Sequence, residues 1–256
     1  MNKLAVVTGA TGGIGHVVTT RLLAEGYSVI ALGHTPKKVT VLDNWLTTQH
    51  ADKGEVLVID VTLAEDWERV DATIDYYQSM GLMLDLLVVC HGHAPTPGPA
   101  MEALRDVQDV LQCDVVGALR ACQVAGRYML ERRHGNIVLV SSLHAKMTYP
   151  ARVPYAVAKA SVCGMARALA VEWGPYNIQI NSISPWQTSG ERTNKFIDNE
   201  YEETGENLLD LYTKKSPLGR IVSPRDIVET VLYLTRNRSI TGQDIVLDCG
   251  VSSSMW

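Results

Sequence analysis

Residues 4–15 read LAVVTGATGGIG, a short apolar run followed by a turn rich in glycine. The run from Leu4 to Val7 is typical of a buried strand, and a helical pattern then continues from Val17 to Gly26. Glycines at a junction from strand to helix let the backbone approach a phosphate, and the start of the helix supplies free N–H groups and a positive dipole. This stretch therefore predicts a phosphate-binding turn at the beginning of an α/β domain.

Strand-like and helical segments alternate through the rest of the chain without a linker, a repeat or a change in composition. This alternation predicts a single α/β domain over residues 1–256, with a doubly wound parallel sheet and helices on both faces. The polar segment at about 186–216 has a helical middle near 200–212, and we expect it to form a substrate-binding lid. Strands are expected at 4–7, 29–32, 55–59, 84–90, 137–141, 178–183 and 244–247. Helices are expected after the glycine turn and at 36–45, 65–80, 102–112, 115–133, 154–173 and 224–234.

Charge and cysteine usage restrict the class of protein. The 256 residues carry a formal net charge of −5 and contain no basic block, which argues against nucleic acid as a partner. The five cysteines are scattered, without the spacing of a zinc site or a disulfide framework, so we expect free thiols in a reducing compartment. No stretch has the roughly 18 uninterrupted apolar residues of a membrane span. We therefore expect a soluble, cytoplasmic protein that binds neither membrane nor metal.

The pair Tyr155 and Lys159 suggests acid-base chemistry. If Pro154 opens a helix, these two side chains lie four residues apart on one face of it. A phenol with its usual pKa near 10 is a poor acid-base catalyst at neutral pH, and a neighbouring ammonium lowers that pKa. Ser142 stands where a strand should end, so its hydroxyl could point at the same substrate oxygen.

Together these motifs resemble the short-chain dehydrogenase/reductase family. The resemblance spans nearly the whole chain and rests on the glycine turn, Asp60 after the third strand, Ser142, the Tyr155 and Lys159 pair, and residues 240–243, ITGQ, before the last strand. It implies a seven-stranded Rossmann sheet and a homotetramer or homodimer. It also implies hydride transfer between a nicotinamide and a small-molecule carbonyl or alcohol.

By this resemblance, Tyr155 exchanges a proton with the substrate oxygen, and Lys159 assists it and holds the nicotinamide ribose. Ser142 would hydrogen-bond the carbonyl oxygen, and Asp60 would bind the adenine edge. The family's proton relay uses an Asn where this chain has Asp114, which would add a negative charge near Lys159. The resemblance implies these cofactor-binding residues: Gly9, Thr11, Gly13, Ile14, Gly15, His34, Asp60, Val61, Gly92, Tyr155, Lys159 and Pro185.

The choice between NAD and NADP stays open. An acidic residue at the end of the second strand usually binds the ribose hydroxyls of NAD, but Gly33 occupies that position here. His34, Lys37 and Lys38 follow it and favour NADP weakly. The lysines could equally be a solvated helix face, and the glycine turn lacks the basic residue that many NADP-binding members of the family carry.

The spacing of His144 and Arg152 resembles that of the 3-hydroxybutyrate dehydrogenases of this family, where residues at these positions grip the substrate carboxylate. A Trp follows the sixth strand there too, as Trp186 does here, and His93 and Gln187 complete the expected substrate residues. This spacing favours a small 3-oxo or 3-hydroxy acid. The alternatives are a 3-oxoacyl-carrier-type or neutral-ketone reductase, and a regulatory protein that binds the dinucleotide without turnover.

Overall fold

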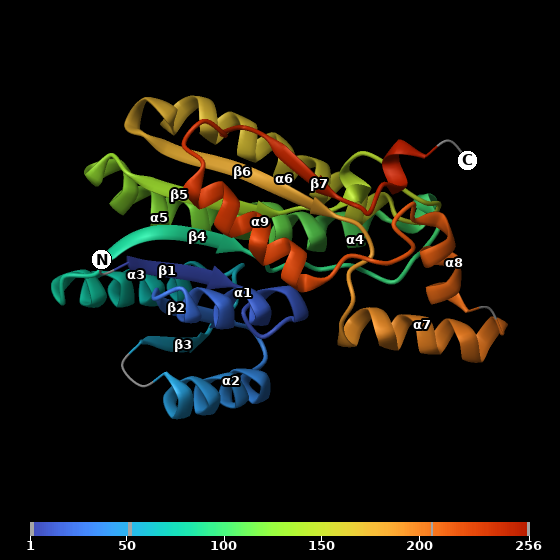
Figure 1. Ribbon diagram of the computed structural model, residues 1–256, viewed down its shortest axis with the longest axis horizontal. Coiled ribbons are helices and arrows are strands. Elements are labelled where there is room, and N and C mark those ends of the chain that lie inside the picture. The colour runs from blue at the N-terminus through green and yellow to red at the C-terminus, as the bar shows by residue number, and fades with distance from the viewer. Residues whose placement is uncertain (1–2, 51–52, 206, 255–256) are drawn as a thin grey trace.

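A seven-stranded parallel sheet forms the centre of the molecule (Figure 1). The structure is a computed structural model that describes residues 3–50, 53–205 and 207–254. Its strand order is β3-β2-β1-β4-β5-β6-β7, and every neighbouring pair is parallel, which confirms the predicted fold. The strands are β1 (Lys3–Thr8), β2 (Ser28–Gly33), β3 (Gly54–Val58), β4 (Met83–Val89), β5 (Gly135–Val140), β6 (Ile178–Pro185) and β7 (Asp244–Leu247).

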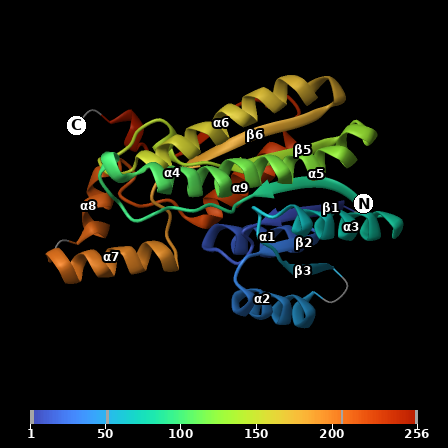
Figure 2. The ribbon, with the colours of Figure 1, turned by 180° about the vertical axis from the view of Figure 1, so that it is seen from behind.

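Helices cover both faces of the sheet. On the face toward the viewer in Figure 1 lie α1 (Gly13–Ala24), α2 (Pro36–Gln49) and α9 (Pro224–Arg236). The opposite face, which Figure 2 brings forward, is covered by α3 (Ala64–Ser79), α5 (Gly117–Arg132) and α6 (Val153–Trp173). Two hydrophobic cores result, one on each side of the sheet.

Alternate residues of each strand supply these two cores. In β1, Leu4 and Val6 pack with α3, α5 and α6, whereas Ala5 and Val7 pack with α1 and α9. All four are buried, because a parallel sheet with helices on both faces leaves no strand face for water. This explains why central strands such as β1 and β2 are largely continuous apolar runs.

A bulge at the start of β4 places a carboxylate inside the protein. Leu4 pairs with Leu84 and Ala5 with Leu86, so Asp85 has no partner on β1. The buried Asp85 carboxylate accepts a hydrogen bond from Tyr27 at 3.1 Å and forms an ion pair with Lys3 at 3.1 Å. This cluster stabilises the amino-terminal edge of the sheet, away from the carboxyl ends of the strands.

Two of the predicted helices are joined by a π-helical turn. The sequence pattern predicts separate helices at 102–112 and 115–133, but α4 (Leu104–Val110) continues through a π turn (Leu111–Val116) directly into α5. The pattern breaks at the π turn because the extra residue per turn shifts the apolar face there. Asp114 lies within this turn.

The predicted lid contains two helices instead of one helical middle. They are α7 (Glu191–Thr204) and α8 (Leu208–Lys215), and α7 ends at Gly205, whose φ of 74° permits the left-handed cap. Both lie at the carboxyl ends of the strands, and α7 projects from the body of the molecule (Figure 1). The short 3₁₀ helices are Ala100–Glu102, Leu143–Ala145, Gly174–Tyr176 and Val251–Ser253.

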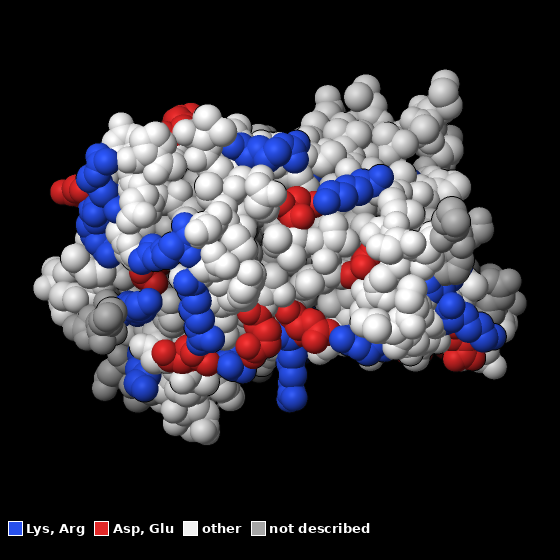
Figure 3. Space-filling model, turned by 45° about the horizontal axis from the view of Figure 1, so that its top comes forward, with Lys and Arg blue, Asp and Glu red and all other residues white. Residues whose placement is uncertain are grey.

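The surface is of mixed charge. On the face shown in Figure 3, basic and acidic side chains are scattered over a larger uncharged area. Within the described residues, no helix has the length and apolar character required to span a bilayer.

Candidate active site

The carboxyl ends of the central strands open into a cavity of about 760 Å³. In parallel α/β sheets this edge is where ligands bind. The cavity brings together predicted residues that lie far apart in the sequence. They are Ile14, Gly92, Ser142, His144, Arg152, Tyr155, Lys159, Pro185, Trp186 and Gln187.

Tyr155 and Lys159 stand one turn apart near the start of α6, which begins at Val153 with Pro154 in its first turn. The Lys159 Nζ lies 5.6 Å from the centre of the Tyr155 ring. The Lys159 side chain is only 5% exposed and also donates to the Val140 carbonyl at 3.3 Å, at the end of β5. Burial and these contacts hold the ammonium beside the phenol ring.

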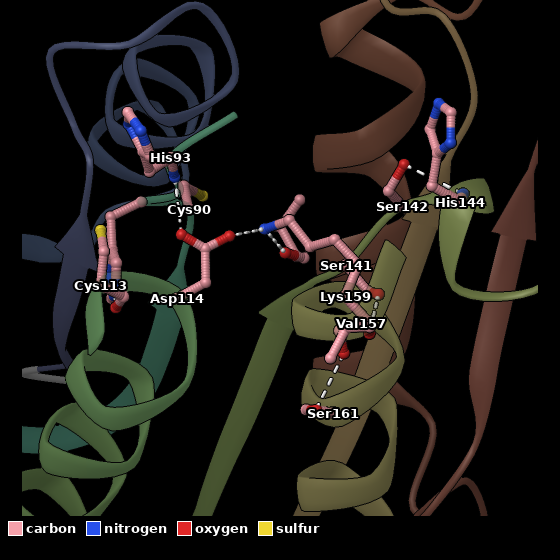
Figure 4. A network of polar contacts seen from close by, with 12 residues as sticks. Cys90, His93, Cys113, Asp114, Ser141, Ser142, His144, Val157, Lys159 and Ser161 are labelled. Atoms are coloured by element: carbon pink, nitrogen blue, oxygen red, sulfur yellow. Dashed lines mark hydrogen bonds and ion pairs between the residues drawn. The ribbon is translucent and has the colours of Figure 1, made fainter. Parts of the chain in front are cut away.

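Asp114 contacts Lys159 directly (Figure 4). The Asp114 Oδ2 lies 3.0 Å from Lys159 Nζ, and Oδ1 accepts a hydrogen bond of 2.6 Å from the His93 backbone N–H. The Asp114 side chain has no exposed surface. The carboxylate therefore stands against the lysine itself, in the position where the resemblance implies a water relay.

The charge of Lys159 depends on this neighbour. Burial alone would lower the pKa of Lys159, but the negative charges of Asp114 and Tyr155 and the hydrogen bond to Asp114 outweigh it and raise that pKa. The ammonium consequently remains protonated throughout the neutral range.

Ser142 follows β5 and is 7% exposed. Its Oγ accepts a hydrogen bond of 3.3 Å from the His144 backbone N–H, which fixes the hydroxyl at the mouth of the cavity. The His144 ring packs edge-on against Tyr149 and Tyr155, at 5.3 and 5.5 Å between ring centres. Burial, with a smaller contribution from Arg152, lowers the pKa of His144 to about 4. His144 is therefore a neutral hydrogen-bonding side chain at pH 7.

His91 connects the glycine turn to the π turn. Its Nδ1 lies 2.6 Å from Thr8 Oγ1, and its Nε2 lies 3.2 Å from the Cys113 carbonyl oxygen. The Thr8 hydroxyl also accepts the Cys90 backbone N–H at 3.1 Å, so a neutral His91 that donates from Nε2 satisfies every partner. Burial, opposed in part by the charge of Asp114, lowers its pKa to about 4. The described residues contain no cluster of His, Cys, Asp or Glu arranged to hold a metal ion.

The glycine turn fits a dinucleotide phosphate. Gly9 has a φ of 64°, and a Cβ there would lie 2.7 Å from the His91 backbone nitrogen. A Cβ on Gly15 would collide with the Gly9 carbonyl, so this glycine permits the close packing of α1 on the turn. A Cβ on Gly13 would meet no atom, and Gly12 provides no side-chain cap for the N–H groups of α1. Exposed N–H donors and open space are what a pyrophosphate requires.

The end of β2 carries no carboxylate, because Gly33 is its last residue. A side chain at Gly33 would meet the Thr11 methyl group at 2.7 Å, so the fold leaves no room for a carboxylate there. His34 follows and is exposed. Asp60 Oδ1 accepts the Thr62 N–H and hydroxyl at 2.9 and 2.7 Å, and these bonds lower its pKa. The carbonyl of Val61, the remaining predicted cofactor residue, accepts Trp67 Nε1 at 2.9 Å.

Other predicted substrate residues have different positions. Arg152 lies at the start of α6 and lines the cavity with Gln187, whereas His93 is exposed and is absent from the lining. Trp186 lines both the main cavity and a smaller one of about 210 Å³, and so does His144. Sequence reasoning missed several lining residues, which carry no motif of their own. They are Cys90, Ala94, Pro95, Thr96, Pro97, Val140, Ser141, Thr188, Thr193 and Lys195.

Comparisons with known proteins identify the family of the chain. The family model described as enoyl-(acyl carrier protein) reductase matches residues 9–252. The short-chain reductase protein NovJ of Streptomyces niveus is 29% identical over 97% of this chain and 93% of its own. A sorbose reductase of Candida albicans is 29% identical over 97% and 86%, respectively.

Solved structures show the same architecture. The structure of a putative gluconate dehydrogenase from Agrobacterium tumefaciens superimposes with a TM-score of 0.88 at 26% identity, over 99% of this chain and 97% of that one. The family match spans both the glycine turn and the Tyr155 helix. The chain belongs to the short-chain dehydrogenase/reductase family, whose members are oxidoreductases that act on CH–OH groups with a nicotinamide dinucleotide.

Proposed function

We propose that this enzyme reduces the keto group of a small ketone that bears a carboxylate, and oxidises the corresponding hydroxy acid, with NADP(H) as the preferred cofactor. The observation that carries the proposal is the lining of one cavity by Ser142, Tyr155 and Lys159 together with the cationic Arg152 and Lys195. No acidic side chain is among the described lining residues.

The residues divide the reaction between them. The cofactor supplies the hydride when bound. Tyr155 donates the proton that the substrate oxygen gains in reduction, and the Ser142 hydroxyl hydrogen-bonds that oxygen as negative charge develops on it. The Lys159 ammonium stabilises the tyrosine after its proton has left. In alcohol oxidation the same groups act in reverse.

The cofactor would lie along the glycine turn. The N–H groups at the start of α1 would bind the pyrophosphate, Lys159 the nicotinamide ribose and Asp60 the adenine side. The preference for NADP is supported by Gly33, where a carboxylate does not fit, and by exposed His34 and Lys37 nearby. An exposed imidazole and ammonium groups suit a 2′-phosphate.

The carboxylate of the substrate would be bound by Arg152, whose planar fork suits a carboxylate. His144 is adjacent and neutral, so it would contribute a hydrogen bond and little charge. A small 3-oxo acid meets these requirements, and so does a sugar acid with an internal ketone. The chain's similarity to a putative gluconate dehydrogenase makes the sugar acid a reasonable second member of the panel.

The test is to follow the reduced nicotinamide absorbance with NADPH and NADH against acetoacetate, 5-ketogluconate, sorbose and cyclohexanone. We expect turnover of at least one acid, and a 10- to 100-fold rise in its KM for Arg152→Ala, which removes a charged hydrogen bond. Arg152→Lys should recover part of the loss, and the exposed Arg105→Ala serves as control. Turnover of the neutral ketones alone, or an unchanged KM in Arg152→Ala, would reject the acid substrate.

A neutral polyol or ketose is the second candidate, favoured by the sorbose reductase among the similar proteins. The same panel separates it, since sorbose would then be reduced with equal kinetics by wild type and Arg152→Ala. Cofactor binding without turnover of any carbonyl would instead indicate a regulatory dinucleotide-binding protein.

We also propose a cytoplasmic homotetramer, or a homodimer if only one interface forms. The five cysteines, all free in the described chain, support a reducing compartment. Exposed apolar side chains on α6, including Val157 and Val171, support an interface between copies. Light scattering of the purified protein measures the assembly directly.

A further inference from the structure

The Asp114 carboxylate is held at both oxygens. Oδ1 accepts the His93 N–H at 2.6 Å, and Oδ2 lies 3.0 Å from Lys159 Nζ. Figure 4 shows the carboxylate between these partners, with Lys159 approaching from α6. Removing a charge from such a buried pair leaves the other charge uncompensated.

Gly92 lies beside the ion pair. A Cβ on Gly92 would lie 2.9 Å from Lys159 Nζ and 3.1 Å from Asp114 Oδ2. A side chain at this position would therefore displace the end of Lys159, of Asp114 or of both. The absence of a side chain at Gly92 leaves the space in which the two charges meet.

The π turn provides the position of Asp114. Residues 111–116 form the turn, and its Cys113 carbonyl is engaged by His91 Nε2 at 3.2 Å. This contact ties the turn to the segment after β4. π turns within α-helices are frequent at functional sites, because the bulge redirects one side chain.

The charged and titratable groups around the pair come from several elements. Lys159 and Tyr155 face it from α6, and the segment after β4 contributes Cys90 and His91. The negative charge of Asp60, which follows β3, helps to raise the pKa of Cys113, next to Asp114 in the chain. Among these groups, Asp114 is the carboxylate in contact with Lys159. After burial, the charge of Asp114 makes the largest contribution to the pKa of Lys159, which it raises.

We propose that Asp114 is a positioning residue whose negative charge holds Lys159 in place and sets the pH range in which the enzyme exchanges protons with its substrate. The proposal rests on the proposed function, because the lysine acts there through Tyr155. Asp114 does not line the cavity, so it acts through Lys159 and not on the substrate.

The sign of the effect follows from electrostatics. A negative charge beside an acid makes loss of its proton less favourable, so removing Asp114 moves proton release from neighbouring groups to lower pH. Oxidation of the alcohol needs a base that takes the substrate proton, so it should then begin at lower pH. Lys159, buried and without its partner, should lose its own proton at lower pH as well.

Asp114→Asn tests the proposal, since the amide keeps the shape and can still accept the His93 N–H. The pH profile of kcat for alcohol oxidation should shift to lower pH by about one unit, with less than a threefold change in KM for substrate. Asp109→Asn, the same change at an exposed position on α4, should leave the profile unchanged. An unshifted profile, a shift to higher pH, or a folded Asp114→Asn enzyme inactive at every pH would overturn the proposal.

A second readout does not depend on turnover. Binding of NADP⁺, followed by protein fluorescence, should be lost in alkaline solution as Lys159 deprotonates, and at lower pH in Asp114→Asn than in wild type. If wild type binds NADP⁺ but turns over no substrate, the proposed function fails, and the shift in the binding profile still tests the role of Asp114. Identical binding profiles in wild type and Asp114→Asn would overturn the role proposed for Asp114. If Asp114→Asn does not fold, the double variant Asp114→Asn with Lys159→Met should fold, because it leaves no buried charge unpaired. If neither variant folds, the proposed dependence of Lys159 on Asp114 is overturned.

Discussion

The Trp186 Nε1 donates a hydrogen bond of 3.1 Å to the Tyr149 hydroxyl, so the segment after β6 is fixed to the loop that precedes α6. The Trp186 ring also packs edge-on against Tyr212 of α8, with 5.6 Å between ring centres. One buried indole thus joins the cavity wall, the loop of the candidate substrate residues and a helix of the proposed lid.

Trp186→Ala should enlarge the cavity, because Trp186 lines both the main cavity and the smaller one. We expect a lower melting temperature, by several degrees, because the truncation removes about 3–5 kcal/mol of packing. We also expect kcat/KM to improve for bulkier ketones relative to small ones. Trp186→Phe keeps most of the packing, and kinetics over a series of ketones of increasing size would distinguish the variants. Equal size preference in Trp186→Ala and wild type would contradict this role.

Tyr155→Phe should lower kcat by about 10²- to 10⁴-fold, since it removes the proton donor. Binding of NADPH, measured by fluorescence, should stay within a few-fold of wild type. The exposed Tyr76→Phe is the matched control and should have normal activity. Retention of more than a tenth of the activity in Tyr155→Phe would assign the proton transfer to another group.

Gly92→Ala should affect turnover more than stability. The added methyl group would lie against Lys159 Nζ and Asp114 Oδ2, so the ion pair must move. We expect kcat to fall at least tenfold, with a small change in melting temperature because the lysine end can shift. Gly98→Ala lies in the same loop, where a Cβ meets no atom, and should be nearly silent in both measurements.

Stability should fall as the solution becomes acidic. His91 has a pKa of about 4 in the folded protein and an ordinary value near 6.5 when unfolded. The unfolded state therefore binds more protons between these values, and the free energy of unfolding decreases as pH falls from about 6.5 to 4. His91 alone accounts for up to about 3 kcal/mol at 1.36 kcal/mol per pKa unit.

Urea denaturation at pH 7, 5.5 and 4.5 measures this loss. His91→Gln can bond Thr8 and the Cys113 carbonyl but does not titrate, so its stability should depend less on pH. The pKa of His144 is also lowered in the folded protein, so His144 too makes stability fall as the pH falls. For this reason the stability of His91→Gln should still depend on pH to some extent. A curve for His91→Gln that parallels wild type would show that His91 is not the titrating group.

The sequence predicts the central strands β1, β2 and β4 well because they are mainly apolar runs buried on both faces. The contact between Asp114 and Lys159 was foreseen only as a nearby negative charge. The role of His91 was not foreseen, because Thr8, His91 and Cys113 meet only when β1, β4 and the π turn are assembled. Likewise, a polar pattern near 200–212 could not reveal that α7 ends at Gly205 and that a second helix, α8, follows it. Local patterns determine elements, whereas contacts between distant segments depend on the complete fold.

The strand order has a consequence for how the chain is made. β1 is bordered by β2 and β4, so its second neighbour is complete only when Val89 has been synthesised. At about 5–20 residues per second, β1 waits on the order of 4–16 s on the ribosome with one edge unpaired. The first third of the nascent chain therefore exposes a strand edge of five consecutive apolar or small residues, Leu4 to Thr8, during that interval. Cotranslational chaperones would have their greatest effect on this protein before β4 emerges.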